Sequence, residues 1–226
     1  MDLGLDGRVV LVVGGTGLIG SATVERLRAE GATVVPASRH VSEGIVMDAR
    51  DDASVHGGVA RVLAEHGRLD AVVVAAAPSA RTLDPERNSD PAQVRDAFDA
   101  KALAFLRVAG AVLPGMRAAG FGRIVGVSGQ NAFSTGNITG SVRNAALVII
   151  AKNLADEVAG SGVTVNTVNP GIVTPAPDPQ VAIGKSGQST PFEVADVITF
   201  LASPRSSGVS GEAIAVGHRM RGFSGL

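Results

Sequence analysis

The chain has 226 residues, of which 45% are hydrophobic and 18% charged, and its formal net charge is −1. This composition suits one α/β domain with a substantial core, and it gives no basic stripe for nucleic acid or an anionic membrane. Because the chain has no cysteine, disulfides and thiolate metal sites are excluded. It has no tyrosine or tryptophan either. No signal peptide or membrane span is expected, so we expect a cytoplasmic protein.

Short apolar runs alternate with longer amphipathic segments, which is the pattern of βαβ units in a parallel sheet. The runs predict strands over residues 9–13, 33–37, 45–47, 71–75, 123–127, 164–168 and 213–216. The segments predict helices over residues 18–30, 55–66, 90–119 and 141–159, and a further helix that a capping box opens at Thr190. We expect the helix over residues 90–119 to bend at Pro114, and residues 174–189 to form a polar loop.

Three glycines stand at a fixed spacing between the first strand and the first helix. Gly14, Gly17 and Gly20 would allow a tight turn, a close approach of the backbone to a pyrophosphate, and close packing of the helix on the strand. The pyrophosphate would bind the unpaired amides at the helix N-terminus. This predicts a dinucleotide site that includes Thr16, Leu18 and Ile19, and the alternative is an ordinary tight turn. The fold class is then α/β, one doubly wound Rossmann domain of about seven parallel strands over residues 1–226.

The end of the second strand should select between the two nicotinamide dinucleotides. Ser38 and Arg39 stand where an NAD-selective protein usually has an acidic residue. A guanidinium group can bind the 2′-phosphate of NADP(H) through its charge, whereas the bare 2′-hydroxyl group of NAD(H) offers no such charge. The sequence therefore favours NADP(H) over NAD(H), while an exposed loop arginine is the alternative interpretation.

Several segments together resemble the short-chain dehydrogenase/reductase superfamily over nearly the whole chain. They are Asp48 after the third strand, Asp70 before the fourth, residues 122–125, residues 165–171 with Thr174, and residues 200–204 followed by Gly211 and Val216. The resemblance implies a seven-stranded parallel sheet, a small-molecule substrate, and a homodimer or homotetramer. It implies that Asp48 and Ala49 lie near adenine, that Ala75, Ala76 and Ala77 follow the fourth strand beside the cofactor, and that Pro170, Gly171, Ile172 and Thr174 border the nicotinamide.

The family's four active-site positions carry other residues here. The asparagine position holds Lys101, the serine position holds Gly129 with Ser128 one residue earlier, and the tyrosine and lysine positions hold Gly140 and Asn144. No shift of the alignment can supply the tyrosine, because the chain contains none. The chain resembles a small atypical branch of the superfamily that lacks the standard tetrad.

The exchange of lysine and asparagine suggests a rewired site. We hypothesise that Lys101 acts as the acid or oxyanion stabiliser, that Asn144 or Ser128 orients it, and that Gly140 leaves space for substrate or water. The alternative is a solvated lysine in a relic pocket. We expect Arg143 to face outward. The loop residues Gln130, Asn131, Ser134 and Thr135 either face the nicotinamide or merely form turns, and the four histidines show no metal-ligand spacing.

Three functions stay open at this point. The first is an NADP(H)-dependent oxidoreductase that acts on a small carbonyl or alcohol with a non-standard proton donor. The second is a catalytically silent cofactor-binding protein, a sensor or a partner subunit. The third is a non-redox lyase or isomerase that uses Lys101.

Overall fold

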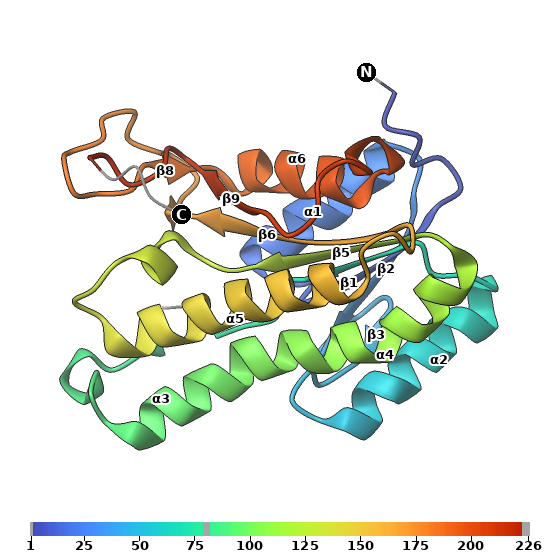
Figure 1. Cartoon of the computed structure of the whole chain (residues 1–226), viewed down its shortest axis with the longest axis horizontal. Helices are drawn as coiled ribbons and strands as arrows, with labels where there is room; N and C mark the ends of the chain where they lie inside the picture. Colours follow the sequence, from blue (N-terminus) through green and yellow to red (C-terminus); the bar gives the residue numbers. More distant parts are fainter. Residues whose placement is uncertain (1, 79–81, 223–226) are drawn as a thin grey trace.

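The computed structural model describes residues 2–78 and 82–222. Seven parallel strands form one sheet in the order β3-β2-β1-β4-β5-β6-β9 (Figure 1). Their bounds are β1 Val9–Val13, β2 Thr33–Ser38, β3 Ile45–Val46, β4 Ala71–Val74, β5 Gly122–Val127, β6 Val163–Pro170 and β9 Ala213–Val216. Two short strands, β7 Ile172–Val173 and β8 Gln188–Ser189, pair with each other outside this sheet. The expected doubly wound sheet of seven strands is confirmed.

Six α-helices among the described residues cover both faces of the sheet. They are α1 Leu18–Ala29, α2 Asp52–His66, α3 Pro91–Phe98, α4 Ala104–Ala119, α5 Ile138–Glu157 and α6 Pro191–Ala202. Helices α1 and α6 lie on one face, and α2, α4 and α5 lie on the other (Figure 1). Strand side chains alternate between these layers: Val9 and Leu11 pack toward α2 and α4, whereas Val10 and Val12 pack toward α1 and α6. Burial on both faces explains why the strands are continuous apolar runs.

Side-chain caps open several helices, including the one for which the sequence predicted a capping box. Thr190 and Glu193 form the capping box that opens α6. Asp51 accepts a hydrogen bond from the amide of Ser54 at the start of α2, and Asp90 accepts one from Ala92 at the start of α3. These side chains satisfy amides that a helix start leaves without partners.

The long helical segment contains a feature that the sequence did not predict. A π-helical turn, η3 Asp99–Leu103, interrupts it, and Pro114, where a bend is expected, lies inside α4. Residues Pro91–Ala119 are long and apolar enough, by length and composition alone, to cross a membrane. However, Phe105, Val108 and Val112 of this segment are buried in the core beneath the sheet. Packing against the sheet therefore accounts for its apolar character.

The sheet order reverses between β1 and β4. From β1 the chain proceeds to β2 and β3 on one side, and from β4 it proceeds to β5, β6 and β9 on the other. Loops at the carboxyl ends of β1 and β4 therefore diverge and leave a crevice, which is where ligands bind in open α/β sheets. The glycine turn after β1 lies at this crevice. Gly14 has a φ of +86°, and a Cβ atom there would lie 2.6 Å from the amide nitrogen of Ala76.

A substitution at Gly20 tests the close packing of this turn. A Cβ atom at Gly20 would lie 2.0 Å from the carbonyl oxygen of Gly14, so Gly20→Ala should lower the free energy of unfolding by about 1–3 kcal/mol through overpacking. Urea unfolding followed by circular dichroism measures this in a chain that has no tryptophan.

Gly110→Ala is the matched control, because Gly110 is an exposed residue of α4 with nothing within 4 Å of the added Cβ. It should raise the free energy of unfolding by roughly 0.5–1 kcal/mol. Equal stability of Gly20→Ala and the wild type would contradict the packing described.

Candidate active site

A cavity of about 760 Å³ opens at the carboxyl ends of β1, β4, β5 and β6. Its volume lies within the range of small-molecule sites. Ten of the residues expected to bind a dinucleotide line it: Gly17, Leu18, Ile19 and Gly20 at the start of α1, Ala75 and Ala77 after β4, and Pro170, Gly171, Ile172 and Thr174 after β6. Segments far apart in the sequence thus converge on one site.

The other expected dinucleotide residues do not line this cavity. Gly14 and Ala76 form the packed contact beneath the turn. Ala49 is 7% exposed and packs in the core. Asp48 accepts a hydrogen bond from the amide of Arg50 at 2.9 Å. Thr16 donates to Ser38 at 3.1 Å between their hydroxyl oxygens, which ties the glycine turn to the end of β2.

The start of α1 fits a diphosphate group. Gly17 is the N-cap residue and supplies no side-chain cap, and the first turn contains no acidic residue. The amides of Leu18, Ile19 and Gly20 therefore lack the intrahelical and side-chain acceptors that would otherwise compete with an anion. Because Leu18 and Ile19 also line the cavity, these amides can hold a phosphate at its edge.

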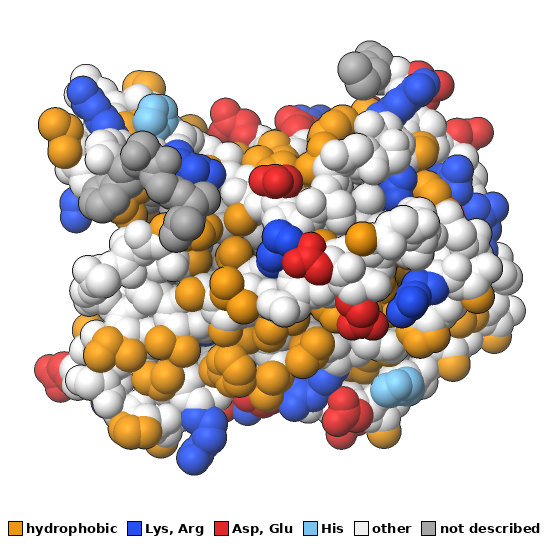
Figure 2. All heavy atoms as spheres, viewed as in Figure 1, with side chains coloured by type: hydrophobic (Ala, Val, Ile, Leu, Met, Phe, Trp, Pro, Cys, Tyr) orange, Lys and Arg blue, Asp and Glu red, His pale blue; other side chains and the backbone are white. Residues whose placement is uncertain are grey.

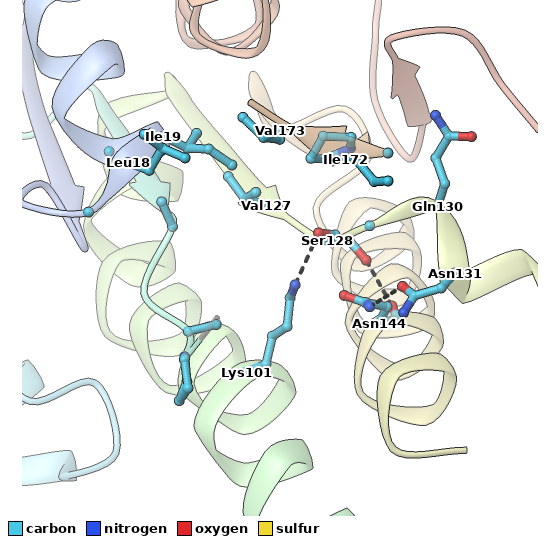
Figure 3. A pocket seen from close by; sticks show the side chains of 18 of the residues that line it. Leu18, Ile19, Lys101, Val127, Ser128, Gln130, Asn131, Asn144, Ile172 and Val173 are labelled. Carbon is cyan, nitrogen blue, oxygen red and sulfur yellow. Dashed lines mark hydrogen bonds between the residues drawn. The ribbon is translucent and has the colours of Figure 1, made fainter. Parts of the chain in front are cut away.

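Lys101 reaches the cavity floor from the π-helical turn. The residue is only 7% exposed, and its Nζ atom donates a hydrogen bond to the carbonyl oxygen of Ser128 at 3.0 Å (Figure 3). Burial, with a smaller contribution from the nearby charge of Arg143, lowers the pKa of the Lys101 ammonium group from 10.5 to about 7. A lysine with this pKa can release or take up a proton near neutral pH.

Two arginines hold the turn that carries Lys101. Asp99, the first residue of the turn, accepts a hydrogen bond from Nε of Arg50 at 2.8 Å and another from Nη2 of Arg107 at 2.8 Å. Arg50 comes from the segment before α2 and Arg107 from α4. π-helical turns are often found at functional sites because they redirect a side chain out of helical register. Here the ion pairs anchor the turn from the side away from the cavity.

Ser128 and Asn144 lie in the cavity wall, but their side chains do not hold Lys101. The hydroxyl group of Ser128 donates to the carbonyl oxygen of Asn144 at 3.0 Å. The side-chain amide nitrogen of Asn144 donates to the carbonyl oxygen of Gly140 at 2.8 Å and to the side-chain oxygen of Asn131 (Figure 3). The orienting group for Lys101 is therefore the main chain of Ser128, and the expected side-chain contacts are absent among the described residues.

The space beside Gly140 is already filled. A Cβ atom at Gly140 would lie 2.6 Å from the side-chain nitrogen of Asn131. The expectation that this position leaves room for substrate or water is wrong at that point, because Asn131 occupies it. Gln130 is also buried and donates to the carbonyl oxygens of Val216 and His218. Gln130 and Asn131 line the cavity, whereas Ser134 and Thr135 do not.

Arg143 faces the cavity, so the expectation that it points outward is wrong. The residue is 4% exposed, and its Nη1 atom donates to the carbonyl oxygen of Pro78 at 3.2 Å. Sequence periodicity could not find it, because α5 carries apolar residues around much of its circumference. The only available signal was a charged residue directly before Asn144. Within the described residues, no group of three or more potential ligands could hold a metal ion.

Comparison with known proteins defines the family. Residues 16–218 match the family model described as Enoyl-(Acyl carrier protein) reductase. The (2S)-[(R)-hydroxy(phenyl)methyl]succinyl-CoA dehydrogenase subunit BbsC of Thauera aromatica is 33% identical, and the alignment covers 93% of each chain. The 3-oxoacyl-[acyl-carrier-protein] reductase FabG of Vibrio harveyi is 28% identical over 95% of this chain and 97% of its own. The crystal structure of gox2181 has the same fold, with a TM-score of 0.81 at 24% identity and coverage of 95% and 96%.

The chain therefore belongs to the short-chain dehydrogenase/reductase family of oxidoreductases. Family membership supports a nicotinamide dinucleotide as the ligand of the crevice. The roles expected of Lys101, Ser128 and Asn144 stay predictions, although all three residues border the same cavity.

The buried ammonium group of Lys101 predicts a pH-dependent stability. The unfolded chain keeps this lysine protonated up to its ordinary pKa of 10.5, whereas the folded chain loses the proton at about pH 7. Between these values the unfolded state binds more protons, so the folded state gains stability as the pH rises, by at most about 1.4 kcal/mol per pH unit. Below pH 7 both states are protonated and the burial penalty is fully present.

The difference in unfolding free energy between the wild type and Lys101→Met, measured by urea unfolding from pH 6 to pH 10, isolates this effect. Above about pH 7, the unfolding free energy of the wild type should rise relative to that of Lys101→Met. The same difference taken with Lys152→Met, which removes an exposed lysine of α5, should stay flat. A flat difference for Lys101→Met would mean that the folded protein keeps Lys101 charged.

Proposed function

We propose that the protein is an NADP(H)-dependent oxidoreductase that interconverts a small carbonyl compound and its alcohol, with Lys101 as the proton donor in place of the missing tyrosine. The observation that carries the proposal is a lysine with a pKa of about 7 on the floor of the cavity that also exposes the start of α1. The names of the two relatives, an oxoacyl reductase and a hydroxyacyl-type dehydrogenase subunit, support carbonyl–alcohol chemistry.

The proton transfer follows from the position of Lys101. A reduced nicotinamide bound in the crevice would supply the hydride to the carbonyl carbon. As that bond forms, the π electrons of the carbonyl move to its oxygen, and the ammonium group of Lys101 donates a proton there and becomes a neutral amine. The Ser128 carbonyl holds Nζ in place during this transfer. Solvent then restores the proton, which is feasible near neutral pH because the pKa is about 7.

Arg39 supports the choice of NADP(H). It is exposed at the end of β2, directly after Ser38, and has no ion-pair partner among residues 2–78 and 82–222. An unpaired guanidinium group at this place can bind the 2′-phosphate through charge-assisted hydrogen bonds. The preference for the phosphorylated dinucleotide therefore rests on one side chain that the described residues leave available.

Replacement of Arg39 should remove the preference for NADPH. Arg39→Ala should raise the dissociation constant for NADPH by about tenfold to a hundredfold, the loss of one or two charge-assisted hydrogen bonds, and leave that for NADH unchanged. Calorimetric titration measures both constants, with Arg61→Ala, an exposed arginine of α2, as the control. A wild type that binds NADH as tightly as NADPH would overturn this assignment.

Replacement of Lys101 tests the proton donor. With a substrate found by screening NADPH oxidation over a panel of carbonyl compounds, Lys101→Met should lower kcat by about 10²- to 10⁴-fold, and Lys152→Met should leave it unchanged. The wild-type kcat should depend on a group with a pKa near 7, and this dependence should vanish in Lys101→Met. Full activity of Lys101→Met would contradict the role of Lys101.

A second candidate function is a partner subunit that binds the dinucleotide and transfers no hydride. The absence of tyrosine from the chain favours it, as does the name of one relative, a dehydrogenase subunit. If NADPH raises the melting temperature while its absorbance never changes across the carbonyl panel, this second function replaces the first. A lyase or isomerase would instead use Lys101 near neutral pH as a base without oxidation.

The expectation of a homodimer or homotetramer stays a prediction, as does a cytoplasmic location. A face of apolar residues supports self-association. Val142 and Ile149 of α5 are 40% and 61% exposed, and Leu106 of α4 is 38% exposed. Apolar side chains gather over these two helices (Figure 2). Burial of such a face against a second copy would remove them from water.

A further inference from the structure

The floor of the cavity carries two buried cations and no acidic residue. Lys101 and Arg143 are 7% and 4% exposed, and both line the cavity. No aspartate or glutamate is among the described residues of its lining, and neither cation forms an ion pair within the described part of the chain. Each donates one hydrogen bond, to the carbonyl oxygen of Ser128 or of Pro78. Buried charges are ordinarily paired, because an unpaired one loses its hydration without compensation.

A second buried arginine shows what a purely structural role requires. Arg123 is 2% exposed and lies outside the cavity. Its Nε and Nη1 atoms donate to three carbonyl oxygens, at 2.8–3.0 Å, and its guanidinium group stacks 4.3 Å from the ring centre of Phe121. Arg143 has one carbonyl partner and no aromatic ring against it in the described residues. The described part of the fold therefore leaves donors of Arg143 without an acceptor.

The unused edge of Arg143 has a definite geometry. Nη1 is bonded to Pro78, while Nε is buried without a partner and Nη2 meets no acceptor among the described residues. Nε and Nη2 form one edge of the planar guanidinium group, and this edge matches the two oxygens of a carboxylate. The amides at the start of α1 would hold a diphosphate. Lys101 and Arg143 are therefore available to bind a further anionic group.

We propose that Arg143 binds a carboxylate group of the substrate, so that the protein acts on oxo acids or the corresponding hydroxy acids, with Lys101 beside the reacting carbonyl. The inference rests on the proposed function, because it takes the anionic ligand to be the substrate of that reaction. Lys101 repels a second cation and attracts an anion, so a carboxylate at Arg143 also stabilises the charged form of Lys101. The substrate itself would neutralise the cavity floor.

A segment next to the cavity lining also carries positive charge. Ser186 lines the cavity, and the adjacent Lys185 is exposed, with its carbonyl oxygen bonded to the amide of Arg221. Arg219 and Arg221 are exposed beside it, and Asp178 is the one acidic residue described in residues 174–189 and 217–222. Lysine and arginine side chains are visible around this part of the molecule in Figure 2. A positive rim attracts anionic ligands and raises their association rate.

Binding of matched acids and esters tests the proposal independently of turnover. Calorimetric titration of the NADP⁺-saturated protein, in which the oxidised cofactor has no hydride to give, would compare 3-oxobutanoate and 4-oxopentanoate with their methyl esters. The wild type should bind at least one acid about tenfold or more tightly than its ester, as expected for a buried charge-assisted pair. Arg143→Gln should abolish that preference, Arg143→Lys should retain part of it, and Arg95→Gln, which changes an exposed arginine of α3, should leave it intact.

Three results would overturn the proposal. The first is equal or absent binding of the acids by the wild type. The second is a preference that survives in a folded Arg143→Gln protein, with folding checked by its melting temperature. The third is an NADPH dissociation constant that Arg143→Gln raises about tenfold, since Arg143 would then bind the cofactor phosphates. If the acid preference is present but no acid is reduced, the carboxylate site stands and the proposed oxidoreductase function fails.

Discussion

The contact on which the rest of the molecule depends is the close approach of three backbone segments at Gly14 and Gly20. A side chain at Gly20 would strike the carbonyl oxygen of Gly14, and a side chain at Gly14 would strike the backbone of Ala76. With hydrogen atoms in these places, α1 starts directly against β1, and the loop after β4 lies against both. Because the sheet order reverses at these same two strands, the amides of α1 open into the crevice instead of packing against a neighbouring loop.

That crevice continues into a cavity whose charge the chain leaves unbalanced. The ion pairs at Asp99 lie behind the π-helical turn and anchor it, yet no carboxylate enters the cavity floor among the described residues. Burial lowers the pKa of the Lys101 ammonium group and that of the Arg143 guanidinium group, and the nearby charge of Arg143 lowers the pKa of Lys101 further. An anionic ligand reverses both penalties at once. In the function that we propose, the same arrangement links acid–base chemistry at Lys101 with selection of a charged substrate at Arg143.

The comparison with relatives separates the fold from the chemistry. A structure with 24% sequence identity shares the whole architecture, because alternating burial and parallel register tolerate many different apolar side chains. The side chains that carry out the reaction cannot be exchanged as freely as the apolar side chains of the core. A chain without tyrosine cannot use a phenol as a proton donor, whatever its fold. Family membership therefore supports a nicotinamide cofactor, and the identity of the proton donor has to be argued from the side chains present.

The order of strands and helices could be predicted from the sequence, because apolar runs of β length alternate with amphipathic segments, and caps such as Asp90 and Thr190 act within one turn of their own helix. The tight glycine turn between β1 and α1 could also be predicted, since the glycine spacing is local. The tertiary structure decided the rest. Three features could not be read from the sequence: the π-helical turn at Lys101, the side chain of Asn131 beside Gly140, and the inward direction of Arg143. Each involves groups that lie apart in the sequence. They are the carbonyl oxygen of Ser128 for Lys101, the facing helix for Asn131, and the carbonyl oxygen of Pro78 for Arg143. Local patterns determine which elements form, whereas the direction of a buried polar side chain is set by acceptors that only the folded chain brings into reach.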